Sequence, residues 1–183
     1  SSGVEPDILI MGKALGAYCP LTATVFSEKV SRSFDDHLFG HGQSYSGHAL
    51  GCAGALAALE VLLGDGVLEA VDEKGSYLEK RLQNLTAKHP CVGDVRGLGL
   101  FYTMELVADP QTRQPLRKST EKYSPTVIAE VSRFLFEERN IYVPSDKFGV
   151  WVVPPLIVTH SEIDWITEAI DEALLRVDQQ LGL

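Results

Sequence analysis

Lys13 has the residue type and the setting for covalent chemistry with an aldehyde. It follows the apolar run Ile8–Met11 and is flanked by Gly12 and Ala14, which leave its backbone open to a ligand. The neutral amine of a lysine is a nucleophile that forms a Schiff base with a carbonyl group. The alternative interpretation is a lysine at a strand end that points into water, and position alone favours this alternative.

The second candidate site is the polar loop Gly42–His48. It carries the hydroxyl groups of Ser44, Tyr45 and Ser46 and leads into the apolar segment 49–63. Hydroxyl groups, together with the free amides at a helix N-terminus, form a natural site for a phosphate. Ordinary capping of that helix by a serine explains the loop equally well, so the residues alone leave both interpretations open.

Other common site patterns are incomplete. His37 and His41 have helical spacing but belong to no H-E-x-x-H motif, so solvated loop histidines are favoured over a zinc site. The glycines around Leu98 lack the third glycine of a dinucleotide fingerprint, and Lys13 is not followed by the Ser or Thr of a phosphate-binding P-loop. The sequence therefore predicts no metal.

Composition excludes several classes of partner. The chain has 183 residues, 45% of them apolar, with a net charge of −9 and no cluster of Lys and Arg. Such a balance argues against a surface for nucleic acid or for anionic membranes. The most apolar stretch, Ala49–Leu63, is interrupted by Glu60 and is too short to cross a bilayer.

The number of cysteines and the first residues of the chain indicate the cellular compartment. Cys19, Cys52 and Cys91 are too few and too scattered for a disulfide framework. The opening residues lack the charged and apolar regions of a signal peptide. We therefore expect a cytoplasmic protein.

The elements that must position Lys13 and the polar loop alternate between strands and helices. Continuous apolar character predicts that Ile8–Met11 is a strand covered on both faces, and that the apolar segment 49–63 is a buried helix. Further patterns predict a strand over 21–26, a short helix over 27–34 and a helix over 67–87.

After residue 88 the pattern changes to a smaller α+β lobe. We expect strands within 92–107 that bend at Arg96–Gly99, short strands at 141–143 and 150–153, and a helix that starts at Ser124-Pro125. Thr159 and Glu162 fit a capping box at the start of the last helix. The predicted domains are 1–88, of α/β type, and 89–183.

Four segments in this order resemble the class III pyridoxal-phosphate aminotransferases of the omega-aminotransferase type. They are PDILIMGKALG from Pro6, HGQSYSGH from His41, GDVRGLGL from Gly93 and PPLIVT from Pro154. The resemblance runs essentially from end to end. It implies a partial fold type I, aspartate-aminotransferase-like large domain over 1–88, followed by the small C-terminal domain over 89–183.

The resemblance also implies roles for single residues. Lys13 would form a Schiff base with pyridoxal 5'-phosphate and move a proton between the substrate carbon and the cofactor. Ser44 stands where the family usually has threonine, whose hydroxyl contacts the cofactor phosphate of the neighbouring subunit, and Tyr45 would lie at the same site. The implied assembly is a homodimer or homotetramer with an active site shared across subunits.

The implied reaction moves an amino group from an amine or omega-amino acid to a keto acid such as pyruvate. Trp151 stands where glutamate-using members carry an arginine, which would suit a less polar donor. Lys147 lies in the stretch where pyruvate-using members carry a mobile arginine, and it could replace that cation imperfectly. The sequence does not place at the substrate any of three other cationic side chains, Arg113, Arg117 and Lys118.

Several parts of the family's site precede the cofactor lysine: a glycine-rich phosphate loop, a stacking aromatic ring and an aspartate for the pyridine nitrogen. They are not in this sequence, which begins without Met and almost at once with an apolar run. We therefore expect more than half of a parent protein upstream, and an isolated chain that is inactive. The alternatives are another pyridoxal-phosphate activity, such as an aminomutase or decarboxylase, or a non-catalytic fragment that acts as a dimerisation or interaction module.

Overall fold

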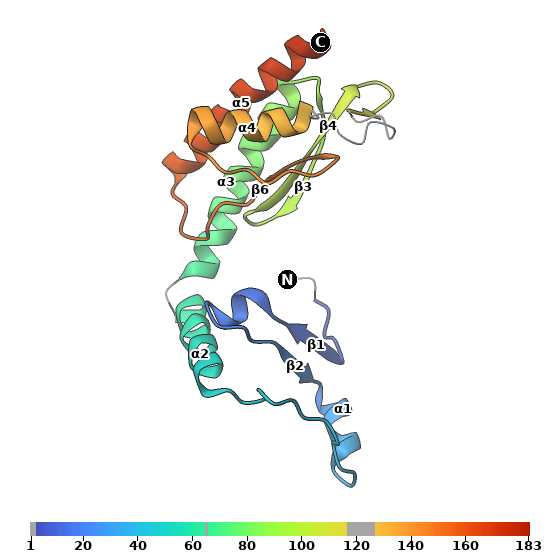
Figure 1. Ribbon diagram of the computed structural model, residues 1–183, viewed down its shortest axis with the longest axis vertical. Helices are drawn as coiled ribbons and strands as arrows, with labels where there is room; N and C mark the ends of the chain where they lie inside the picture. The colour runs from blue at the N-terminus through green and yellow to red at the C-terminus, as the bar shows by residue number, and fades with distance from the viewer. Residues whose placement is uncertain (1–2, 65, 117–126) are drawn as a thin grey trace. The chain divides into compact units, whose positions relative to one another are not determined.

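The computed structural model describes residues 3–64, 66–116 and 127–183 (Figure 1). Contacts within the chain divide it into two compact units, Ser1–Val67 and Leu68–Leu183, called here the first and the second unit. The helix start expected at Ser124-Pro125 lies outside the described residues.

The first unit contains two strands and a series of helical segments. They are β1 (Ile8–Met11), η1 (Lys13–Gly16), β2 (Ala23–Phe26), α1 (Glu28–Ser31), η2 (Arg32–Phe34) and α2 (Ala49–Gly64). The strands pair antiparallel, with Ile8 opposite Phe26 and Met11 opposite Ala23. Each element that the sequence predicted in this region is present.

The predicted burial of β1 and α2 is wrong for the described chain. The side chains of Ile8 and Ile10 are 51% and 74% exposed. In α2 only Gly51 and Ala55 are buried. Within the described residues, β1 pairs only with β2. A two-stranded sheet and α2 are too few elements to bury all the apolar side chains of this unit.

The second unit combines an antiparallel sheet with three helices. In chain order its elements are α3 (Val67–Lys88), β3 (Val92–Leu98), β4 (Phe101–Asp109), β5 (Gln114–Pro115), α4 (Val127–Arg139), β6 (Gly149–Val152) and α5 (His160–Leu181). Strand β4 is central and pairs with β3, β5 and β6 (Figure 1).

The strand predicted at 141–143 is not formed. Only an isolated bridge between Ser145 and Val150 follows it, and the carbonyl of Pro144 accepts a hydrogen bond from the Trp151 amide. Proline has no N–H to donate, so it interrupts a ladder of backbone bonds at this edge of β6.

Side chains from all three helices and from the sheet form one core. Burial alternates along β4, where Tyr102 and Met104 are buried while Phe101 is exposed. Leu78 and Leu82 of α3 are fully buried in the same core. Burying one such leucine stabilises the fold by roughly 2 kcal/mol. Helix α3 thus packs with the second unit, while the domain boundary predicted after residue 88 stays a prediction.

The start of α5 has the predicted capping box. The Thr159 hydroxyl accepts a hydrogen bond from the Glu162 amide at 3.3 Å, and the Glu162 carboxylate accepts one from the Thr159 amide at 2.7 Å. These bonds satisfy backbone donors that the first helical turn leaves free.

The part of the chain that the structure describes contains neither a single membrane-spanning helix nor a metal-binding cluster. There, no single helix is long and apolar enough to cross a membrane, although α2 and α3 taken together pass on length and composition. The same residues contain no group of three or more His, Cys, Asp or Glu side chains placed to hold a metal ion.

Candidate functional site

Lys13 occupies an unusual backbone position. It opens the η1 turn directly after β1, with a φ of 52°. This left-handed region costs a side-chain-bearing residue about 1–2 kcal/mol, and glycine is the residue that usually occupies it. Lys13 is exposed, and its amine has no hydrogen bond or ion pair among the described residues. The strained turn thus presents a free amine.

Helix α2 holds the η1 turn in place. Gly16 is the buried residue of η1, and a Cβ atom there would lie 3.0 Å from the Cβ of Leu21. A Cβ atom on Gly54 of α2 would lie 3.2 Å from the Gly16 carbonyl oxygen. Small residues on both sides therefore let α2 and the turn approach closely, which fixes the backbone that carries Lys13.

The polar loop ends in a helix cap that is not a serine. The Nδ1 atom of His48 accepts a hydrogen bond from the Gly51 amide at 3.4 Å, at the start of α2. The Ser46 hydroxyl instead accepts from the Gln43 amide at 3.1 Å, which closes a turn within the loop. Capping of α2 by a serine, one of the two interpretations of this loop, is therefore wrong.

The hydroxyl of Ser44 stays available in this arrangement. Ser44 lies in the turn before α2, is exposed, and has no hydrogen-bond partner among the residues described. The neighbouring Tyr45 ring is 80% exposed and meets the His48 ring edge-on, with centroids 6.0 Å apart. Both predicted residues thus present polar groups to solvent.

A hollow of about 370 Å³, the Tyr45 hollow, lies between the residues that follow η1 and the polar loop. Residues after η1, residues of the polar loop and one residue of α2 line it: Cys19, Pro20, Leu21, Tyr45, His48 and Leu50. Lys13 and Ser44 are not among these lining residues. Of the predicted cofactor residues, the structure therefore places only Tyr45 at this hollow.

Trp151 lies on β6 in the second unit. Its ring is 37% exposed and lies beside Phe101 of β4, with ring centroids 6.4 Å apart. Trp151 also lines a hollow of about 250 Å³, whose other lining residues are apolar or uncharged: Asn140, Ile141, Tyr142, Val143, Val152, Val153, Pro154, Pro155, Trp165 and Ile166. The surroundings of Trp151 suit an apolar group.

Lys147 lies in the turn before β6 and does not line that hollow. Its ammonium group lies 4.7 Å from the centroid of the Phe148 ring. The neighbouring Asp146 carboxylate accepts hydrogen bonds from the Phe148 and Gly149 amides, at 2.7 and 3.1 Å, and so holds the turn. Lys147 is an exposed cation on an ordered turn.

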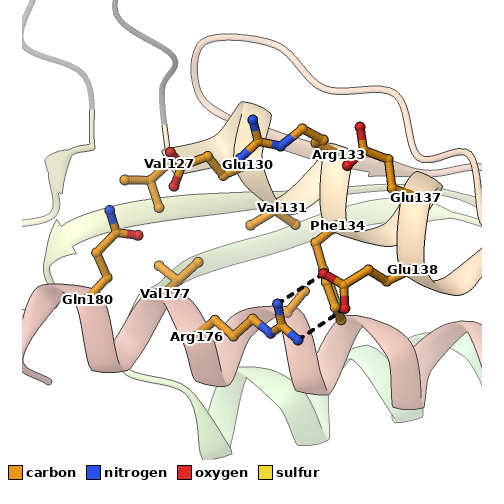
Figure 2. Close-up of a pocket in the computed structure, with 11 residues that line it drawn as sticks. Val127, Glu130, Val131, Arg133, Phe134, Glu137, Glu138, Arg176, Val177 and Gln180 are labelled. Carbon is orange, nitrogen blue, oxygen red and sulfur yellow. Dashed lines mark hydrogen bonds and ion pairs between the residues drawn. The ribbon is translucent and has the colours of Figure 1, made fainter.

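The groove between α4 and α5 contains none of the predicted site residues (Figure 2). Its volume is about 360 Å³, and many of its lining residues are charged. The Arg176 guanidinium lies 3.8 Å from the centroid of the Phe134 ring and pairs with the Glu138 carboxylate at 3.4 Å. We interpret these contacts as packing between the two helices.

The chain matches a family model over most of its length. That model, described as aminotransferase class-III, covers residues 1–174.

Curated relatives extend well beyond this chain. The taurine–pyruvate aminotransferase of Bilophila wadsworthia is 34% identical over 194 aligned residues, which cover 98% of this chain and 41% of the relative. The diaminobutyrate–2-oxoglutarate transaminase of Halomonas elongata is 32% identical, with coverage of 98% and 39%. The chain thus spans about two fifths of the length of these relatives.

Solved structures share its fold. One is the taurine:2-oxoglutarate aminotransferase from Bifidobacterium kashiwanohense, in complex with PLP and glutamate. It matches with a TM-score of 0.88 and 29% identity, and the match covers 98% of this chain and 40% of the solved chain. An (S)-enantioselective omega-transaminase from Thermomicrobium roseum has a TM-score of 0.81 and 33% identity, with coverage of 96% and 38%.

Proposed function

The chain belongs to the class-III aminotransferases, and from this membership we propose that it transfers an amino group from an amine or omega-amino acid to a keto acid such as pyruvate. The observation that carries the proposal is the free amine of Lys13 on a strained turn directly after β1. Pyridoxal 5'-phosphate is the cofactor of this family, and a solved relative contains it.

The residues of the first unit fit that cofactor. Lys13 has an exposed amine, and the small residues Gly12 and Ala14 leave room beside it. Ser44 has an exposed hydroxyl without a partner among the described residues, which is the kind of donor a phosphate accepts. When bound, pyridoxal phosphate supplies an aldehyde and an electron-withdrawing ring.

Lys13 has two tasks in the proposed reaction. Its Nζ atom would hold the bound cofactor covalently, and the cofactor would supply there the aldehyde carbon that takes up the amino group of the donor. The same Nζ atom would accept the proton from the carbon that bears the donor's amino group, as a general base. Because its side chain is flexible and α2 fixes its backbone, Lys13 can reach both the cofactor and the donor carbon.

Ser44 and Tyr45 are proposed to bind the cofactor phosphate, with Ser44 acting toward the neighbouring subunit of a homodimer or homotetramer. This proposal draws on the family resemblance of the loop and on the free Ser44 hydroxyl. Lys147 is proposed to attract the carboxylate of the keto acid, because it is an exposed cation on a turn that Asp146 holds.

Replacing Lys13 with alanine tests the function. In the full-length protein loaded with pyridoxal phosphate, Lys13→Ala is expected to remove the visible absorbance band of the lysine Schiff base and to abolish amino transfer. The control is Lys29→Ala, because Lys29 is also an exposed lysine of the first unit but pairs with Asp7 at 3.3 Å. Persistence of both the band and amino transfer in Lys13→Ala would contradict the assignment.

A further inference from the structure

The connection between α3 and β3 contains a buried histidine whose ring contacts α5 through both nitrogens. His89 is 2% exposed and lies directly after the last residue of α3. Its Nδ1 atom lies 2.7 Å from an oxygen of Asp178, and its Nε2 atom lies 2.7 Å from an oxygen of Asp171. Both distances are typical of hydrogen bonds that involve a charged group.

These two contacts require a proton between each ring nitrogen and its carboxylate. A neutral imidazole has a single N–H, and an ionised carboxylate has only acceptor atoms. Burial acts to raise the pKa of Asp171, but hydrogen bonds from Lys88 and His89 outweigh it and lower that pKa, so this group is ionised. The other oxygen of Asp178 accepts a hydrogen bond from the Cys91 amide. Imidazole is a stronger base than a carboxylate, so both protons belong to the ring.

The charges of this group balance when the ring carries two protons. The Lys88 ammonium group, at the end of α3, donates to both oxygens of Asp171, at 2.7 and 2.5 Å. Two cations, Lys88 and His89, then face two anions of α5, Asp171 and Asp178. The Cys91 thiol adds no charge, because burial, followed by Asp178, raises its pKa. Loss of one ring proton would leave a carboxylate facing a nitrogen lone pair, which is unfavourable in a buried position.

The same contacts keep the Cys91 thiol away from solvent. Cys91 is 0% exposed and is separated from His89 by Pro90 alone. Its amide donates to Asp178 at 3.0 Å, and its carbonyl oxygen accepts from the Val107 amide of β4 at 2.8 Å. Asp178 therefore holds both His89 and Cys91 on α5, and movement of this connection away from α5 must break both contacts.

We propose that His89, Asp171 and Asp178 form a pH-sensitive clasp, in which a doubly protonated His89 holds the connection between α3 and β3 on α5, and loss of one ring proton opens that connection and exposes the Cys91 thiol. The clasp needs a protonated ring and ionised carboxylates at the same time. It therefore opens as the pH rises and the ring loses a proton. Opening is local, because the rest of the core does not depend on this proton.

The rate of alkylation of Cys91 measures this opening. Iodoacetamide is added to the full-length protein, and the peptide that contains Cys91 is followed by mass spectrometry. Each rate is divided by the rate for the same cysteine in the urea-unfolded protein at the same pH, because the thiolate is the form that reacts. This ratio is expected to rise at least about tenfold between about pH 6 and about pH 9.

His89→Gln tests the role of the ring. Glutamine is neutral and cannot donate from two opposite sides to two carboxylates, so near neutral pH the ratio should rise at least about tenfold, and its increase with pH should disappear. The matched control is His160→Gln, since His160 of α5 also lies 3.0 Å from a carboxylate, that of Glu73, but is exposed. This control should keep the wild-type ratio at every pH.

Three results would overturn the clasp. The first is a wild-type ratio that stays constant as the pH rises, and the second is a folded His89→Gln protein with the wild-type ratio. The third is a rise in the ratio that accompanies loss of far-ultraviolet dichroism, since the whole chain then unfolds. If His89→Gln does not fold, the pH series of the wild type and of His160→Gln decides.

Discussion

His89 is an almost fully buried residue held between two carboxylates. Its Nδ1 atom lies 2.7 Å from Asp178 and its Nε2 atom 2.7 Å from Asp171, both on α5. The second oxygen of Asp178 accepts a hydrogen bond from the Cys91 amide at 3.0 Å. The end of α3 and the start of β3 are thereby joined to α5 by charged and polar contacts.

Asp171 predicts a pH dependence of stability. Burial acts to raise its pKa, but hydrogen bonds from Lys88 and His89 outweigh burial, so the pKa of Asp171 is lowered. A carboxylate with a lowered folded-state pKa stabilises the fold above its unfolded pKa of about 4, and this contribution is lost as the pH falls through the folded value. Asp171→Asn should therefore flatten the acid side of the melting-temperature profile.

Thermal unfolding of wild type and Asp171→Asn between about pH 6 and pH 2 measures this effect. Asp146→Asn serves as a control, because Asp146 is an exposed carboxylate in the turn before β6. A wild-type acid slope that survives in Asp171→Asn would show that other carboxylates cause it.

Single residues differ in how far the sequence could predict them. Lys13 was predicted as the cofactor lysine from the order of the motifs around it, and this role stays a prediction; its left-handed φ was not predicted. Phe101 was missed as a neighbour of Trp151, since that contact depends on the register of β4 against β6. The contacts of His89 were also missed, because its partners lie 82 and 89 positions later in the chain.

The approach of α3 to the β3–β4 turn depends on two glycines. A Cβ atom on Gly75 would lie 2.6 Å from the carbonyl oxygen of Gly99, closer than real side chains come. Gly99 itself has a φ of +59°, which glycine adopts without strain. Helix α3 and this turn therefore pack backbone to backbone.

Gly75→Ala is expected to destabilise the second unit by about 2 kcal/mol, because backbone atoms must move to admit the methyl group. This direction opposes helix propensity, which favours alanine over glycine by about 1 kcal/mol. The matched control is Gly64→Ala at the end of α2, where the added methyl meets nothing within 4 Å. Urea unfolding of both variants measures the difference, and equal stabilities would refute the packing argument.

Elements were predicted best where local chemistry determines them. The capping box of α5 and the helix expected over 67–87 were found where the sequence placed them. The strand expected at 141–143 is absent because pairing with β6 needs a ladder of backbone hydrogen bonds, and Pro144 interrupts that ladder. The burial expected for β1 and α2 was wrong because an apolar sequence shows only that side chains favour burial. It does not show which other element would pack against them.

At the scale of the whole molecule, the two units differ in how completely they bury their apolar side chains. The second unit has a continuous core of buried residues from α3, α4, α5 and the sheet. The first unit leaves large side chains of α2 exposed, among them Leu50 at 64%, Leu56 at 59% and Leu63 at 74%. Apolar surface of this extent usually marks an interface.

We therefore expect the 183-residue chain, expressed by itself, to self-associate and to bind pyridoxal phosphate weakly. Size-exclusion chromatography with light scattering measures the association. Changing Leu50, Leu56 and Leu63 together to glutamate should reduce it, since charge on α2 opposes apolar contact. A chain that remains monomeric at tens of micromolar and binds the cofactor tightly would contradict this expectation.

The positions of the two tryptophans have an optical consequence. The sequence contains only Trp151 and Trp165, and both belong to the second unit. Intrinsic fluorescence excited at the indole band therefore reports the second unit, while the first unit contributes only tyrosines, Tyr18 and Tyr45. A denaturation followed by indole emission and again by far-ultraviolet dichroism would thus separate the melting of one unit from that of the whole chain.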